Sequence, residues 1–189
     1  MSFPLMPIAI PQRQPGSLVG SGSFTVPLGV TSVSFTIRGG GGGRGGNATA
    51  AGSGDAPQTG YGGGGGNGAT VVGTIAVTTG DVIVATLGAV GTAGTNVTIS
   101  SPGGATGNYG SSGTQTVITK NGITVATASP GIRGVPGSCY VSTNGFNSAS
   151  NGPGGAGGTT GTGGTVTAGA NGVSGSATNG ADATSTITW

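Results

Sequence analysis

The chain contains no histidine and no glutamate, and five basic and three acidic residues are its only charged side chains among 189. Acid–base catalysis usually needs His, Glu or paired Asp, whereas Asp55, Asp81 and Asp182 are far apart in the sequence. A zinc site needs a cluster of Cys, His or carboxylate ligands, which the single Cys139 cannot supply. We therefore expect no enzyme, no metal site and no cofactor.

Basic residues and long apolar runs are also scarce. Nucleic-acid binding needs clustered cations, and five scattered ones do not form a cluster, so the pI of about 9.1 predicts no nucleic-acid partner. No stretch reaches the roughly 20 apolar residues of a membrane span. Prolines 4, 7, 11 and 15 interrupt the N-terminus, which is unlike a signal peptide, so we expect cytoplasmic synthesis and no membrane insertion. Cys139 is expected to be a small buried residue.

Glycine is the abundant residue, with 47 copies beside ten prolines. Such a composition borders on low complexity, but disordered chains are usually rich in charge. Glycine recurs at every third position in several runs, the longest being Gly152, Gly155, Gly158, Gly161 and Gly164. A polyproline II helix has three residues per turn, so these runs give it one bare face on which another backbone can pack. We predict packed polyproline II segments; disordered linkers are the alternative.

Alternating apolar residues predict β-strands between the glycine runs. Residues 21–38 are expected to form a β-hairpin or a pair of strands with a turn at Pro27-Leu28-Gly29, and Phe24, Phe35 and Trp189 are expected to belong to the core. Further strands are predicted over 70–77, 82–87, 97–100, 115–119, 123–128, 138–142 and 184–189. Asn121-Gly122 predicts a type I′ hairpin turn, and Asp81 is expected to cap its own turn.

The predicted fold is therefore all-β: a jelly-roll-like β-sandwich with glycine-rich loops partly packed as polyproline II helices and no significant α-helix. Residues 1–20 form an extended, proline-rich arm, and residues 21–189 form the domain, with polyproline II tracts notably over 39–68, 102–113 and 152–175. An exposed apolar arm is expected to dock on another protein. The docking side chains are predicted to be Phe3, Leu5, Met6, Ile8 and Ile10.

Two phrases of the sequence resemble a known family. Residues 22–43 contain Val26-Pro27-Leu28-Gly29-Val30-Thr31, followed by a predicted strand and a polyglycine run. Residues 62–88 begin with another polyglycine run and place Thr79-Gly80-Asp81 between two predicted strands. This order, over about residues 20–189, resembles the glycine-rich domain of tail fibres, spikes and tip adhesins of tailed bacteriophages. The resemblance implies a β-sandwich with glycine-rich loops on a virion appendage.

The resemblance also implies a function and partners. We expect a virion structural protein, on the tail or capsid surface, that docks on other virion proteins through residues 1–20 and presents glycine-rich loops for host attachment. A host surface glycan or an outer-membrane protein is the expected receptor, and a homo-oligomer, with a trimer favoured, is the expected assembly. A capsid-associated decoration or head-fibre protein is the alternative, and an ice-binding protein is a further one.

Four exposed-looking aromatic residues are the candidate receptor contacts. Tyr61, Tyr109 and Phe146 lie among Gly, Ser and Asn, and Tyr140 lies at the edge of a short predicted strand. Tyr with Ser, Gly and Asn is the composition of adaptable binding loops. A local packing role for these rings is the alternative interpretation.

Overall fold

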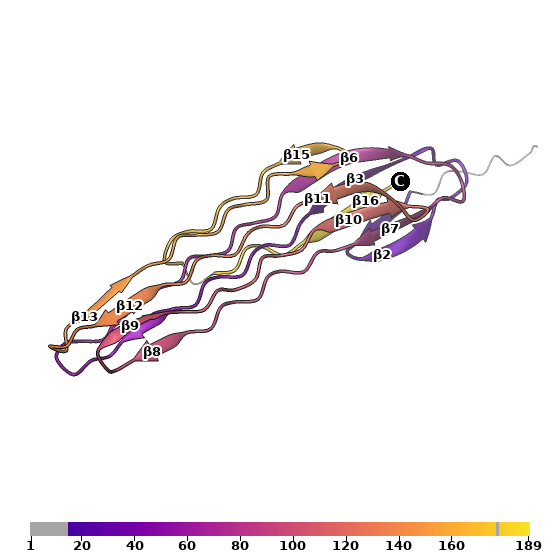
Figure 1. The fold of residues 1–189 in the computed structure, drawn as a ribbon. Coiled ribbons are helices and arrows are strands. Elements are labelled where there is room, and N and C mark those ends of the chain that lie inside the picture. Colours follow the sequence, from indigo (N-terminus) through magenta and orange to yellow (C-terminus); the bar gives the residue numbers. More distant parts are fainter. Residues whose placement is uncertain (1–14, 177) are drawn as a thin grey trace, which may run out of the picture.

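A computed structural model describes residues 15–176 and 178–189, which form a rod with β-sheets at both ends and glycine-rich segments between them (Figure 1). These residues contain strands and no α-helix, so the all-β prediction is confirmed. No helix in the described part of the chain could span a membrane. The predicted docking side chains, Phe3, Leu5, Met6, Ile8 and Ile10, lie outside the described residues.

One end of the rod is a large β-sandwich of two five-stranded sheets. The first sheet has the order β1 (Ser17–Val19), β16 (Thr184–Thr188), β3 (Ser32–Arg38), β6 (Thr70–Ala76), β15 (Thr165–Thr167). The second has the order β14 (Gly161–Thr162), β11 (Ile123–Ala128), β10 (Thr116–Lys120), β7 (Val82–Thr86), β2 (Gly22–Thr25). All of these pairs are antiparallel.

The inner faces of these sheets form the main hydrophobic core. Strand β3 shows the cause: Val33, Phe35 and Ile37 are buried while the residues between them face outward, as a period of two requires. Ile83 and Ile118 pack against them from the second sheet. The ring of Phe24 stacks on Trp189 with centroids 4.0 Å apart, and both pack against this core. The three aromatic core predictions are therefore confirmed.

Two turns at the outer end of the large sandwich hold each other. Asn121 has φ of 51° and Gly122 has φ of 81° between the paired strands β10 and β11, so the predicted type I′ turn is confirmed. Asp81 accepts hydrogen bonds from the Thr78 backbone N–H at 2.9 Å and the Asn121 side-chain amide at 2.7 Å. These bonds lower the pKa of Asp81, with the Thr78 bond making the larger contribution. Asp81 thus caps its own turn, as expected, and also joins that turn to the hairpin.

The hairpin interpretation of residues 21–38 is wrong, whereas the pair-of-strands interpretation is correct. Strand β2 pairs with β7 in one sheet, and β3 pairs with β16 and β6 in the other. The turn at Pro27-Leu28-Gly29, with Gly29 at φ of 83°, carries the chain from one layer to the other. Each strand has one apolar face. Placing the strands in two facing sheets buries both apolar faces, which favours two layers over a single hairpin within one sheet.

The other end of the rod is a smaller pair of sheets. Strand β12 (Ser138–Val141) lies between β9 (Gly103–Thr106) and β13 (Asn147–Ser150), and β4 (Ala48–Ala50) lies between β5 (Gln58–Gly60) and β8 (Val97–Ile99). The β4–β8 pair is parallel. Ala48, Ala50, Cys139 and Val141 form its small core, and Cys139 is buried, as expected.

Between the sandwiches, glycine-rich segments run side by side along the rod (Figure 1). They comprise residues 39–47, 61–69, 87–96, 107–115, 129–137, 151–160, 168–173 and 178–183. Their contacts repeat every third residue: the N–H groups of Gly131, Gly134 and Gly137 donate to the carbonyls of Gly40, Gly43 and Gly46. This period is that of a polyproline II helix. At about 3.1 Å per residue, nine residues give a bundle roughly 28 Å long.

Two segments, 39–47 and 61–69, form the interior of the bundle. Their glycines are all buried, and a Cβ atom on most of them would come closer than 3.0 Å to the backbone of a neighbouring segment. The outer segments carry glycine mainly at the positions that face a neighbouring segment and other residues elsewhere, as in 87–96. A fully surrounded helix therefore needs glycine at nearly every position, whereas a helix at the surface needs it only at every third. All of these partners come from the same chain.

At the ends and edges of the bundle, asparagine side chains accept hydrogen bonds from backbone N–H groups that have no carbonyl partner on a neighbouring segment. The Oδ1 atom of Asn179 accepts from the Arg44 backbone N–H at 2.9 Å, and that of Asn67 accepts from the Ala181 N–H at 2.8 Å. The same bond is made by Asn96 to Asn47, Asn47 to Gly62, Asn151 to Tyr61 and Asn171 to Gly157. Backbone donors in a packed bundle need partners, and these amides supply them where no further segment exists.

The glycine tracts are shorter than the sequence predicts. Strands β4 and β5 divide the tract expected over 39–68, and β9 occupies the first third of that over 102–113. Within 152–175, Gly161 and Gly164 lie in the turn region of β14 and β15, which pair with β11 and β6. The five-glycine run is therefore not one helix, because its last residues join the sheets. Likewise Ser17–Val19, within the arm expected over 1–20, pairs with β16.

Candidate functional site

Three loops meet at the end of the rod formed by the small sheets. They connect β4 to β5 (residues 51–57), β8 to β9 (residues 100–102) and β12 to β13 (residues 142–146). Residues from all three line one hollow of about 380 Å³. Its lining is made of Gly52, Ser53, Ser100, Pro102, Val141, Ser142, Thr143, Asn144 and Gly145. The hollow therefore offers hydroxyl, amide and backbone groups and no charged side chain.

Asn147, at the start of β13, holds the 51–57 loop against that strand. Its Oδ1 atom accepts a hydrogen bond from the Gly52 N–H at 3.0 Å. Its Nδ2 atom donates to the carbonyls of Asp55 at 3.1 Å and Ala56 at 2.9 Å. One side chain thus fixes both sides of the 51–57 loop.

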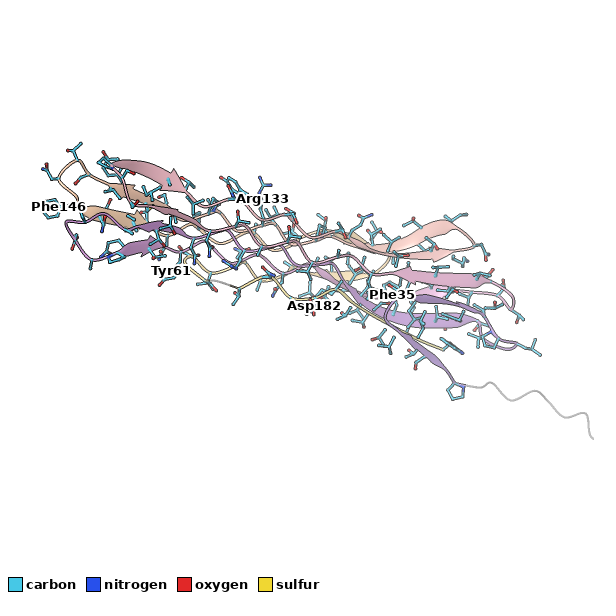
Figure 2. The ribbon with its side chains drawn as sticks, turned by 90° about the horizontal axis from the view of Figure 1, so that it is seen from below. Phe35, Tyr61, Arg133, Phe146 and Asp182 are labelled. Atoms are coloured by element: carbon cyan, nitrogen blue, oxygen red, sulfur yellow. The ribbon has the colours of Figure 1, made fainter. Side chains whose placement is uncertain are left out.

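The 142–146 loop is closed by its own hydrogen bonds. The Ser142 Oγ atom accepts from the Phe146 N–H at 3.0 Å, and the Ser142 N–H donates to the Phe146 carbonyl at 2.9 Å. Gly145 has φ of 80°, a conformation that suits glycine. The Phe146 side chain remains 63% exposed at the tip of the rod (Figure 2). A fixed backbone therefore presents a free aromatic ring.

We expect Asn147→Ala to loosen the tip without unfolding the rod. The half-buried Gly52 N–H would lose its partner, which costs about 1–3 kcal/mol, and the 51–57 loop would lose both of its amide contacts. Hydrogen exchange at Gly52 and Ala56 should become faster, while exchange in β3 stays unchanged. Asn144→Ala is the matched control, since the described residues give its side chain no hydrogen bond. Equal exchange in both variants would contradict the role of Asn147.

The predicted contact residues do not form one site. Phe146 lies in a tip loop, and Tyr140 lies on the outer face of β12. Tyr109 and Tyr61 lie on the bundle, in segments 107–115 and 61–69. All four rings are about half exposed or more. Figure 2 separates Tyr61 and Arg133, the contact partner of Tyr109, on opposite sides of the rod.

Sequence analysis missed the residues that build the tip. Asn147, Gly52 and the 51–57 loop carry no motif, because their roles arise only when β4, β5 and β13 lie next to one another. One local signal was available: Asn144-Gly145 between the short strands β12 and β13 is a typical hairpin sequence.

No group of three or more Cys, Asp or other metal-ligating side chains gathers anywhere in the described ranges. Comparison with protein-family models and with curated proteins finds no match to this chain.

Proposed function

We propose that this protein is a structural subunit of a bacteriophage virion, of the tail-fibre or spike type, which holds receptor-binding loops away from the particle. One observation carries the proposal. Strand β1, which follows residue 15, lies in the large sandwich, and the three tip loops lie at the opposite end of the rod (Figure 1). A docking arm and a receptor-binding tip would therefore be separated by the whole bundle.

The bundle has the properties that a spacer needs. Its interior segments are joined to their neighbours by backbone hydrogen bonds of 2.8–3.1 Å, such as Gly43 to Ser111 and Gly66 to Ile132. Regular cross-links in several directions leave little room for bending. Loops on a rigid scaffold commonly carry binding, and the uncharged tip hollow beside Phe146 suits either a surface glycan or a loop of an outer-membrane protein.

The docking arm in this proposal is residues 1–14, since Ser17–Val19 belong to the sheet. Deletion of residues 1–14 should leave thermal unfolding of the domain unchanged but remove the protein from purified particles. Normal incorporation of the deletion variant would contradict the docking role. A trimeric assembly on the particle belongs to the same proposal.

The attachment role is tested separately with Phe146→Ala, which changes only an exposed ring. We expect normal incorporation into particles and slower adsorption to host cells. Unchanged adsorption would argue against attachment through the tip. Antibody labelling of intact particles locates the subunit: label at the tail tip supports the proposal, and label on the head favours a decoration or head-fibre protein.

A further inference from the structure

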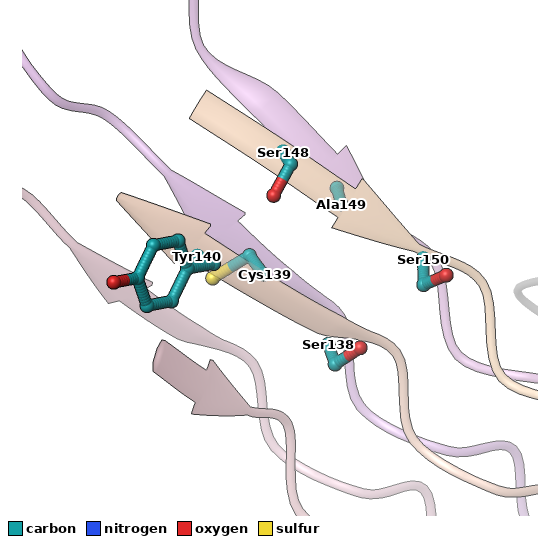
Figure 3. Close-up of a pocket in the computed structure, with 6 residues that line it drawn as sticks. All are labelled: Ser138, Cys139, Tyr140, Ser148, Ala149 and Ser150. Atoms are coloured by element: carbon teal, nitrogen blue, oxygen red, sulfur yellow. The ribbon is translucent and has the colours of Figure 1, made fainter. Parts of the chain in front are cut away.

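A second binding surface lies on the flank of the rod, apart from the tip loops. Its first part is the outer face of the β9–β12–β13 sheet, where a hollow of about 260 Å³ is lined by Ser138, Tyr140, Ser148 and Ser150 together with Cys139 and Ala149 (Figure 3). The register places Tyr140 between Gly104 and Ser148, and Ser138 between Thr106 and Ser150. A single aromatic ring therefore borders a group of serine hydroxyls at the strand spacing of a sheet.

The Tyr140 ring lies over β9 because that strand leaves space for it. A Cβ atom on Gly104 would be 3.5 Å from the Cδ2 atom of Tyr140, which is ordinary contact, so the ring rests on the glycine. The side chain is 49% exposed. An aromatic face attracts the weakly positive C–H groups of a sugar ring, and the neighbouring serines can exchange hydrogen bonds with its hydroxyls.

The second part of the surface continues from these strands into the bundle. Strand β9 continues into segment 107–115, and segment 129–137 continues into β12; the two segments stay adjacent through the Gly107 N–H to Gly137 carbonyl bond of 2.9 Å. Gly107, Gly131 and Gly134 face the interior, so Tyr109 and Arg133 face outward. From Gly104, beneath Tyr140, to Tyr109 the chain advances about 16 Å at 3.1–3.3 Å per residue.

Arg133 is a guanidinium without an anionic partner on this flank. It lies 4.6 Å from the centroid of the Tyr109 ring, a cation–π contact that orients it. Within the described ranges the only ion pair joins Lys120 to Asp81, and the Arg133 side chain donates no hydrogen bond. Its planar donors are therefore free to bind a carboxylate in bidentate geometry.

We propose that this flank binds an acidic oligosaccharide, with one sugar against Tyr140 and its serines and a carboxylate of a later sugar on Arg133. The juxtaposition of an aromatic ring beside hydroxyls with a free guanidinium on Tyr109, a residue about 16 Å farther along the chain, favours an extended, carboxylate-bearing chain of sugars. A neutral glycan would leave Arg133 unused, and a small anion would leave Tyr140 unused. The proposal concerns the isolated protein and does not depend on its place in a particle.

The test measures binding of the full chain to oligogalacturonate, polysialic acid and hyaluronan, with maltooligosaccharide as the neutral probe. We expect binding to at least one acidic probe and much weaker binding to the neutral one. Arg133→Gln should weaken the acidic interaction about tenfold, the loss expected for a charge-assisted hydrogen bond, and Tyr140→Ala should weaken it by a similar factor.

Two control variants separate this flank from a general charge effect. Arg44→Gln removes a partly buried cation elsewhere on the bundle, and Tyr61→Ala removes an aromatic ring from another segment; both should leave binding unchanged. No binding of any acidic probe, equal binding of the neutral probe, or equal losses in the control variants would each overturn the proposal. Thermal unfolding of every variant should match the parent chain, since all four side chains are partly exposed.

Discussion

Replacing Gly43 by alanine is expected to destabilise the protein by more than about 3 kcal/mol, above the usual cost of overpacking. The added Cβ atom would come closer than 3.0 Å to the carbonyls of Gly91 and Thr92. Both are backbone groups, so no side-chain rotation can relieve the clash. Moving segment 87–96 away would weaken its hydrogen bonds to the interior, such as Gly91 to Gly41 at 2.8 Å.

The test compares the thermal unfolding of Gly43→Ala with that of a control variant, Gly104→Ala. Gly104, in β9, also has an ordinary φ, but a Cβ atom there would meet only contacts of 3.5 Å and 3.7 Å. Gly104→Ala should therefore change stability by less than about 1 kcal/mol, the difference in backbone entropy between Gly and Ala. Similar melting temperatures for both variants would contradict the close backbone packing of the bundle.

Ile37→Ala is expected to cost about 2–5 kcal/mol, the range for a large cavity in a core. Ile37 is fully buried between the two sheets of the large sandwich, in the strand that leads into segment 39–47. The large sandwich holds most of the buried apolar side chains of the described chain. Loss of one of the largest of them should therefore destabilise the end of the rod that anchors every glycine segment.

The control for this second prediction is Ile123→Ala at the β10–β11 hairpin, where the isoleucine side chain is 71% exposed. Denaturant unfolding should show a shift of less than about 0.5 kcal/mol for this surface change. Equal shifts for the two isoleucines would mean that the sandwich core does not limit stability. The two pairs of variants test opposite properties. The glycine bundle is expected to tolerate no added methyl group, whereas the core of the large sandwich is expected to tolerate no loss of side-chain volume.

Local signals predicted the longest strands and their turns, whereas seven short strands were missed: β1, β4, β5, β9, β13, β14 and β15. Alternation in residues 32–37 and 184–189 gave buried and exposed faces that the structure confirms, and Asn121-Gly122 formed the expected turn. Glycine at every third position predicted a threefold repeat of contacts, which the bundle has. These signals depend only on a residue and its near neighbours.

Long-range pairing could not be predicted in the same way. The sheet assignment of β2 and β3 depends on partners far along the chain, β7 and β16. The end of the five-glycine run depends on β11 and β6, which take up Gly161–Thr162 and Thr165–Thr167. The tip site could not be predicted for the same reason, since Asn147 contacts residues more than 90 positions away.

The threefold repeat of the bundle restricts how the length of this rod can change in evolution. A segment with three extra residues would carry donors and acceptors that face no partner, unless its neighbours gained a triplet at the same level. Lengthening therefore requires coordinated insertions of whole triplets in many places, each step adding about 9 Å. The loops at 51–57, 100–102 and 142–146 carry no such restriction, so we expect related chains to vary in the length of those loops and to keep the length of the bundle constant.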